Sequence, residues 1–276
     1  MERGAKTRGK YAKLLAGVEA IEIKATIPDK QVKAALARYK LTERNDDERY
    51  IYFFDTPRLE LLAQGIIMRA RRVVGDDHDT TVKFRPVDPA ALDKEWSKYR
   101  DFKIEADASE KGIVKSASFT MPVAKGLIKR VATKNKGIAS LFTKEQERFL
   151  AVVAGHEPNI DKLSVLGPLR AQRWDFEDPA CPWKLTAELW RREDGDTLME
   201  ISVKAPAAQG AAVMAGFMAF LAEVGAERDT SEQAKTRWAL EYYANRLRKQ
   251  PVAKKKKKPL AKKRGKKAAT PRSRKS

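Results

Sequence analysis

Cysteine and histidine are nearly absent from this chain of 276 residues, which contains one cysteine and two histidines. Cys181 has no partner for an internal disulfide. His78 and His156 stand far from each other in the sequence, so they predict neither a zinc site nor a pairing of a histidine with a nucleophilic cysteine. Any metal ion that this protein binds would therefore be held by carboxylates.

Long apolar runs are missing too. No stretch reaches the roughly 18 consecutive apolar residues that predict a transmembrane helix. The first residues, Met1 to Lys6, lack the apolar stretch of a signal peptide. We therefore expect a protein that neither spans a membrane nor is secreted, and cytoplasmic location is the default prediction.

Acidic residues are absent from the last part of the chain. The net charge is +20, yet residues 251–276 contain thirteen Lys and Arg and no acid, so most of the excess lies there. Such a tail cannot bury apolar surface, and we expect it to be disordered. Before it, ten Phe and five Trp supply a sizeable core. The predicted organisation is a basic arm over residues 1–17, a folded domain over 18–250 and a tail over 251–276.

Basic residues alternate with apolar ones in two neighbouring stretches. Arg69 and Arg71 flank Ala70, and Lys83 and Arg85 flank Phe84. Residues two apart on a strand share one face, so each stretch predicts a strand with one apolar and one cationic face. No acid is expected on the cationic face, where like charges would repel one another. A bound polyanion would relieve that repulsion.

An ordinary antiparallel sheet with one solvated face produces the same alternation. For any single strand this plainer interpretation is the better one. The repetition of grouped positive charge over two strands favours an anion-binding face instead.

The whole pattern predicts an α+β protein built on a closed eight-stranded antiparallel β-barrel, a tunnel, flanked by helices. Expected strands cover residues 18–26, 50–54, 66–74, 80–87, 99–107, 163–177, 184–192 and 197–204. Helices are expected after Pro28, after Asp55-Thr56-Pro57, and within residues 120–155, 211–224 and 231–247.

Read in order, these segments resemble the CYTH family of triphosphate tunnel metalloenzymes. The motifs that carry the resemblance are Glu22-Ile23-Lys24, Phe54-Asp55-Thr56-Pro57, Arg69-Ala70-Arg71, Thr81-Val82-Lys83-Phe84-Arg85 and Glu200-Ile201-Ser202. Arg173 and Glu188 fall where the family has a phosphate-binding arginine and an acid before a turn. Ser231 and Lys235 fit its C-terminal signature. Each motif alone is weak, but their order over residues 18–247 is specific.

The resemblance implies roles for these residues. Lys24, Arg69, Arg71, Lys83, Arg85 and Arg173 would bind a triphosphate, and Glu22, Glu188 and Glu200 would hold Mg²⁺ or Mn²⁺. Lys83, crowded by cations that lower its pKa, is also a candidate catalytic base, although simple phosphate binding is the commoner role of such a lysine.

Two departures weaken the metal prediction. Ala20 and Ser202 stand where the family usually has glutamates, so one ion can still be held but a second is in doubt. Glu105 would either replace a missing ligand or form ion pairs with neighbouring cations.

The predicted function is metal-dependent hydrolysis of an inorganic or organic triphosphate in the tunnel. One alternative is a catalytically weak module that binds polyphosphate or a nucleotide. Another is a nucleic-acid-associated protein that acts through non-specific contacts of its basic tail, which would also suit long polyphosphate. An adenylyl cyclase of the same fold is open as well, but no base-recognition element is evident.

Overall fold

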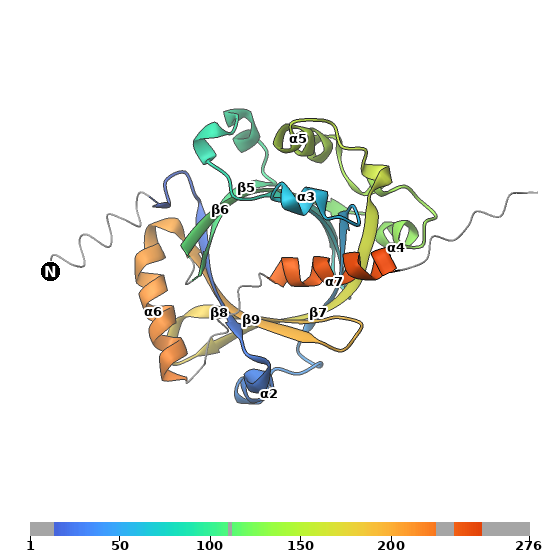
Figure 1. Cartoon of the computed structure of the whole chain (residues 1–276). Helices are drawn as coiled ribbons and strands as arrows, with labels where there is room; N and C mark the ends of the chain where they lie inside the picture. Colours follow the sequence, from blue (N-terminus) through green and yellow to red (C-terminus); the bar gives the residue numbers. More distant parts are fainter. Residues whose placement is uncertain (1–13, 110–111, 225–234, 250–276) are drawn as a thin grey trace, which may run out of the picture.

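The computed structural model describes residues 14–109, 112–224 and 235–249. The predicted tail over 251–276 and most of the predicted basic arm over 1–17 lie outside these residues, as does Ser231 of the C-terminal signature. The described part forms a closed β-barrel with helices around its outside (Figure 1).

Nine strands make up the barrel within the described residues. They are β1 (Ala20–Ile27), β2 (Asp47–Asp55), β3 (Ile66–Val73), β4 (His78–Phe84), β5 (Phe102–Ser109), β6 (Gly112–Val123), β7 (Ser164–Asp178), β8 (Cys181–Arg191) and β9 (Thr197–Pro206). Around the barrel their order is β1-β5-β6-β4-β3-β2-β7-β8-β9, and β9 pairs with β1 to close the ring.

The predicted count of eight antiparallel strands is wrong, because β6 was placed in a loop and a helix. Glycine, serine and Pro122 make its sequence a poor match to strand preferences. Pairing with both β4 and β5 supplies the stability that the local sequence lacks. A closed ring with an odd number of strands needs at least one parallel pair, and here β1 and β5 run parallel.

Six α-helices and five short 3₁₀ helices complete the described elements. The α-helices are α2 (Asp29–Arg38), α3 (Glu60–Ala63), α4 (Leu127–Ala132), α5 (Lys144–Ala154), α6 (Gly210–Glu223) and α7 (Lys235–Lys249). Helices expected after Pro28, after Asp55-Thr56-Pro57 and over 211–224 are confirmed. The helical region expected over 120–155 begins only after β6 and is split into α4 and α5.

Apolar side chains point out of the barrel, where the helices cover them. On one side, α2 and α6 pack on strand residues such as Ile21, Ile23 and Val203. On another side, α4 and α5 pack on residues such as Met68 and Phe119. Since successive strand residues alternate between faces, the polar residues between them face the barrel interior.

Helix α7 packs at a different place on the barrel from the other helices. The apolar face of α7 packs on a third cluster that includes Phe53, Ile67 and Trp190, and these three side chains also line the barrel interior. Helix α7 therefore closes one end of the interior, and in Figure 1 it is seen across the ring.

None of the helices in the described ranges is long and apolar enough to cross a membrane.

Candidate functional site

The barrel encloses a cavity of about 520 Å³. All nine residues predicted for the site line it, so the structure brings the predicted set together. Ten of the lining side chains are basic and five are acidic. The basic residues are Lys24, Arg49, Arg69, Arg71, Lys83, Arg85, Lys103, Arg173, Lys204 and Lys235, and the acidic residues are Glu22, Asp101, Glu105, Glu188 and Glu200.

The cationic faces of β3 and β4 lie inside the barrel rather than on a solvated outer surface. Met68 and Ala70 are buried on the outside beneath the helices, whereas Arg69 and Arg71 line the cavity. The plainer interpretation, an open solvated face, is therefore wrong for these strands.

Four arginines on the adjacent strands β3, β2 and β7 form what we call the arginine wall: Arg49, Arg69, Arg71 and Arg173. Arg69 is its least satisfied member. Its only side-chain hydrogen bond among the described residues is a weak one of 3.4 Å from Nη2 to Thr81 Oγ1, and its buried Nε has no acceptor. Burial and the neighbouring Arg71 lower the pKa of Arg69 to about 10. Within the described chain this guanidinium makes no ion pair, so the wall has an excess of positive charge.

Other members of the wall do have acids beside them. Arg71 donates from Nε to both carboxylate oxygens of Asp79, at 3.1 and 2.9 Å. Asp79 is the direct cross-strand partner of Arg71. The expectation that no acid shares this face is therefore wrong: β4 begins at His78, so Asp79 belongs to the strand and not to the preceding turn. Arg173 pairs similarly with Asp175, at 2.5 Å.

Arg49 is a member that the sequence analysis missed. Strand β2 begins at Asp47, three residues before the predicted start, and this places Arg49 on the cavity side. It pairs with Asp47, and its buried Nε has no acceptor. Residues two apart on a strand share a face, so the available signal was that Arg49 lies on the same face as Ile51 and Phe53, and Phe53 also lines the cavity.

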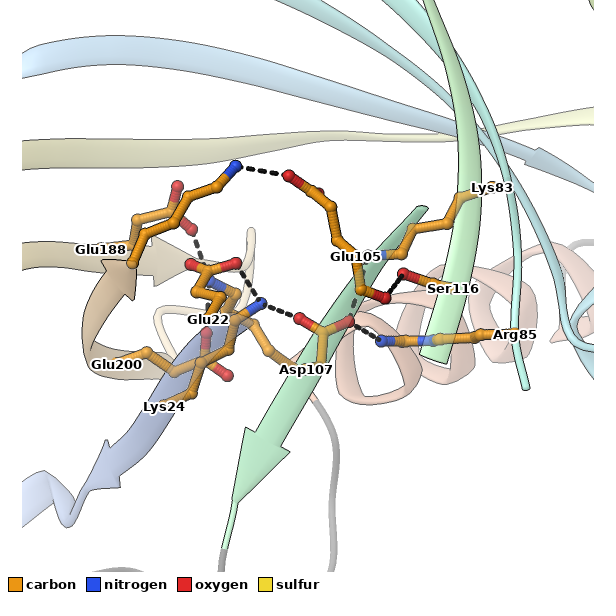
Figure 2. A network of polar contacts seen from close by, with 11 residues as sticks. Glu22, Lys24, Lys83, Arg85, Glu105, Asp107, Ser116, Glu188 and Glu200 are labelled. Carbon is orange, nitrogen blue, oxygen red and sulfur yellow. Dashed lines mark hydrogen bonds and ion pairs between the residues drawn. The ribbon is translucent and has the colours of Figure 1, made fainter. Parts of the chain in front are cut away.

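On the other side of the cavity, one largely buried carboxylate contacts three cations. Asp107 on β5 contacts Lys24 at 2.8 Å, Lys83 at 3.1 Å and Arg85 at 3.8 Å (Figure 2). Burial alone would raise the pKa of Asp107, but the three cations hold it far below its usual range. The predicted site omitted Asp107, although it shares a strand face with Lys103 and Glu105.

The two lysines that contact Asp107 have pKa values shifted in opposite directions. Burial acts against the charge of Lys24, yet Asp107, Glu22 and Glu200 raise its pKa above the ordinary value. For Lys83, burial together with Lys24 and Arg85 lowers the pKa, and Asp107 only partly opposes this. Burial and neighbouring cations thus lower the pKa of Lys83, whereas the pKa values of Lys24 and Lys235, despite burial, are raised by their carboxylate partners.

The predicted metal ligands Glu188 and Glu200 share a lysine instead. They are cross-strand partners on β8 and β9, and Lys235 at the start of α7 contacts both, with 2.6 Å from its Nζ to Glu200 Oε2. Although burial would raise it, the pKa of Glu188 is held low, chiefly by Lys235. The sequence analysis noted Lys235 only as part of a signature and assigned it no contact.

Glu22 and Glu105 are also paired with lysines. Glu22 lies 3.0 Å from Lys24, and Glu105 lies 2.5 Å from Lys204. Across the ranges that the structure describes, no three acidic, histidine or cysteine side chains are grouped to hold a metal ion. As arranged, the three predicted ligands therefore do not fit a divalent ion, and Glu105 forms an ion pair rather than replacing a ligand.

We call the acids of the adjacent strands β8, β9, β1 and β5 the carboxylate wall: Glu22, Glu105, Asp107, Glu188 and Glu200. Every member contacts at least one lysine. The cavity thus combines one wall with an unpaired arginine and another wall whose acids are all neutralised by lysine.

The sequence matches no protein-family model and no curated protein. Several solved structures share its fold, including the following two. A candidate adenylate cyclase from Bacillus halodurans has a TM-score of 0.56 and 16% identity, and the match covers 80% of this chain and 97% of that one. The candidate adenylyl cyclase HpAC1 from Hippeastrum, described as having a dominant triphosphatase activity, has a TM-score of 0.56 and 18% identity over 82% of this chain and 95% of that one. The chain forms a closed barrel with the motifs on its strands, and these two structures share its fold. It therefore has the CYTH-type tunnel fold.

Proposed function

We propose that this protein binds the triphosphate group of an inorganic or organic triphosphate in its cavity and hydrolyses it. The observation that carries the proposal is Arg69: a partly buried guanidinium whose Nε is buried without an acceptor and which makes no ion pair among the described residues, in a cavity with twice as many basic as acidic lining residues. A buried charge without a partner is costly, so such an arrangement is expected where a ligand supplies the opposite charge.

The chemistry of the lining suits phosphate oxygens. The guanidinium groups of Arg69, Arg71 and Arg173 can each donate two hydrogen bonds to one phosphate. Since phosphoryl transfer depends on positioning and on neutralising charge, the arginine wall would hold the phosphate chain while Lys24 and Arg85 neutralise the reacting phosphate.

Lys83 would act as the base in this reaction. The oxygen of a water molecule forms a bond to the terminal phosphorus while the bond from that phosphorus to the bridging oxygen breaks. The neutral amine of Lys83 accepts a proton from the water, and the remaining phosphates leave with the electron pair of the broken bond. A lowered pKa favours this role, because a larger fraction of the amine is neutral near physiological pH.

The fold of HpAC1, whose description includes triphosphatase activity, adds support at the level of fold. Dependence on Mg²⁺ or Mn²⁺, the organic part of the substrate and the cytoplasmic location stay predictions.

A second candidate function is binding of a triphosphate or polyphosphate without turnover. The observation that favours it is the pairing of Glu188 and Glu200 with Lys235, because this leaves the expected metal ligands occupied. Metal-assisted hydrolysis would then be slow or absent, while the arginine wall would still bind anions.

Phosphate release separates the two functions. The full chain is incubated with tripolyphosphate, thiamine triphosphate, ATP or long-chain polyphosphate, each with Mg²⁺, Mn²⁺ or EDTA. The proposed hydrolase releases phosphate from at least one substrate, and Lys83→Met abolishes this release without abolishing binding. A binding module releases none, yet tripolyphosphate still raises its melting temperature.

The melting temperature also tests binding by itself. Tripolyphosphate at about a hundred times its dissociation constant should add roughly 2.7 kcal/mol to the free energy of unfolding. Sulfate and monophosphate at equal ionic strength should add much less, because neither spans several cationic groups. Equal shifts with all three anions would refute both functions.

A further inference from the structure

We propose that Lys235 is a built-in cation that takes the place of a divalent metal ion between Glu188 and Glu200, so that the unliganded protein excludes Mg²⁺ and Mn²⁺ from this pair of carboxylates. The inference deepens the proposed function by making triphosphate binding independent of metal. Its first test contains no triphosphate, so it can fail without the proposed function failing.

The geometry places the amine where a metal ion would lie. Glu188 and Glu200 are directly opposite each other on β8 and β9, and like charges in that position repel. The Nζ of Lys235 contacts an oxygen of each, which removes the repulsion. A divalent ion bridging the same two carboxylates would lie next to this amine, where the two cations repel each other, so the ion and the amine compete.

Lys235 is held in this position from several directions. Its side chain is 12% exposed, and its amine lies 4.6 Å from the centre of the Trp190 ring, within range for a cation–π interaction. The helix that carries it is anchored further along, where the hydroxyl of Tyr243 donates a hydrogen bond of 2.6 Å to the carbonyl oxygen of Pro168. The lysine is therefore a packed part of the cavity wall and not a solvated surface side chain.

Two residues that depart from the family pattern favour a lysine, with its single positive charge, over a divalent ion between Glu188 and Glu200. Ser202, beside Glu200 on the cavity face of β9, and Ala20, two residues before Glu22, add no carboxylate. Glu22, the third predicted ligand, already contacts Lys24. With fewer acids, one lysine comes closer to neutralising the pair, and a divalent ion has fewer ligands to gain.

Binding of Mn²⁺ alone tests the inference. Mn²⁺ is titrated into the full wild-type chain and three variants, and free Mn²⁺ is followed by electron paramagnetic resonance. We expect Lys235→Met to bind one Mn²⁺ at least tenfold more tightly than the wild type, because two carboxylates lose their cation. Lys235→Arg keeps the charge and should bind as weakly as the wild type. Lys204→Met removes one positive charge from the same cavity, beside Glu105, and should not create the site.

An equal Mn²⁺ affinity in the wild type and a folded Lys235→Met would overturn the inference, as would a tenfold gain in Lys204→Met. Circular dichroism establishes that the variant is folded. If Lys235→Met does not fold, Glu200→Gln in the wild-type background still decides the matter. It should leave Mn²⁺ affinity unchanged if Lys235 occupies the pair, whereas weaker Mn²⁺ binding would show that the pair already binds the ion.

Tripolyphosphate provides the second readout. Its affinity for the wild type, measured by calorimetry in EDTA, should be within threefold of its affinity in Mg²⁺. A hundredfold gain with Mg²⁺ would show that a metal ion completes the anion site and that Lys235 does not replace it. Absence of binding in both buffers would instead contradict the proposed function, and the Mn²⁺ titration would still stand.

Discussion

The arginine wall and the carboxylate wall line the same cavity, but their charges are balanced in different ways. On the arginine wall, Arg71 and Arg173 have aspartates, while Arg69 has none among the described residues. On the carboxylate wall, each acid contacts a lysine, and Asp107 contacts three cations. The comparison indicates that the first wall needs an anion from outside, whereas the second wall already contains the cations it needs.

The largest expected effect comes from removing the unpaired arginine. Arg69→Met should weaken tripolyphosphate binding by about 10- to 100-fold, since hydrogen bonds to charged groups contribute roughly 1.5–3 kcal/mol and about 1.4 kcal/mol is a factor of ten. The melting temperature without ligand should stay the same or rise, because the variant loses an unsatisfied buried cation. Isothermal titration calorimetry and thermal melts measure the two effects.

Arg72→Met is the matched control for Arg69→Met. Arg72 lies on the same strand but on the opposite face, with its guanidinium 4.2 Å from the centre of the Tyr50 ring. It should leave tripolyphosphate affinity within about twofold of the wild type. If both variants weaken binding equally, the effect is one of overall charge and the arginine wall is not the binding site.

A smaller effect is expected from the acid that opposes Lys83. Asp107 raises the pKa of Lys83, so in Asp107→Asn this pKa should fall further. If neutral Lys83 is the base, the acidic limb of the pH profile of phosphate release moves to lower pH in the variant. A limb that stays in place, or moves to higher pH, would mean that Lys83 is not the titrating base.

The free energy of unfolding also depends on pH through Asp107. The pKa of Asp107 is lower in the folded than in the unfolded chain, so its contribution to the free energy of unfolding is fully present above the unfolded pKa of about 4 and is lost as pH falls through the folded value. Wild-type stability should therefore decline more steeply below about pH 4 than that of Asp107→Asn. Urea melts at several pH values measure this difference.

A still smaller change is expected on the carboxylate wall. Glu200→Gln makes the cavity more positive, so tripolyphosphate should bind a few-fold more tightly at low salt, and the gain should shrink as salt rises. The free energy of unfolding should fall, because Lys235 loses one of two partners. Glu95→Gln, which makes the same charge change at an ion pair on the outside, should not alter binding. Weaker binding by Glu200→Gln would contradict the division between the walls.

The smallest effect on the cavity is expected from the tail. A chain that ends at Gln250 should keep its fold and its tripolyphosphate affinity, because, within the residues that the structure describes, none of the lining residues lies beyond Thr236. Its affinity for duplex DNA should fall, together with the salt dependence of that affinity, if the thirteen basic residues contact phosphates. Equal DNA affinities and equal salt dependence for both chains would show that the tail contacts no polyanion.

Much of the cavity was predictable because a strand places alternate residues on opposite faces. This local rule put Arg69 and Lys83 on the charged faces of their strands, the resemblance to the CYTH family added Lys24 and a shared tunnel, and the structure places all three in one interior. It failed for Arg49 and Asp79, where the strand begins two or three residues earlier than the apolar pattern indicates. It failed also for β6, whose small residues give no clear alternation.

The sequence by itself thus determined which face is charged on strands such as β3, because that depends only on residues two apart. Tertiary structure alone decided which charges meet. Asp107 reaches Lys24 because β5 lies parallel to β1, and it reaches Lys83 although 24 residues separate them. Lys235 reaches Glu188 because α7 closes the barrel at that end. Strand order, register and helix docking depend on packing over the whole barrel, so no local pattern could have shown that the predicted metal ligands are held by a lysine.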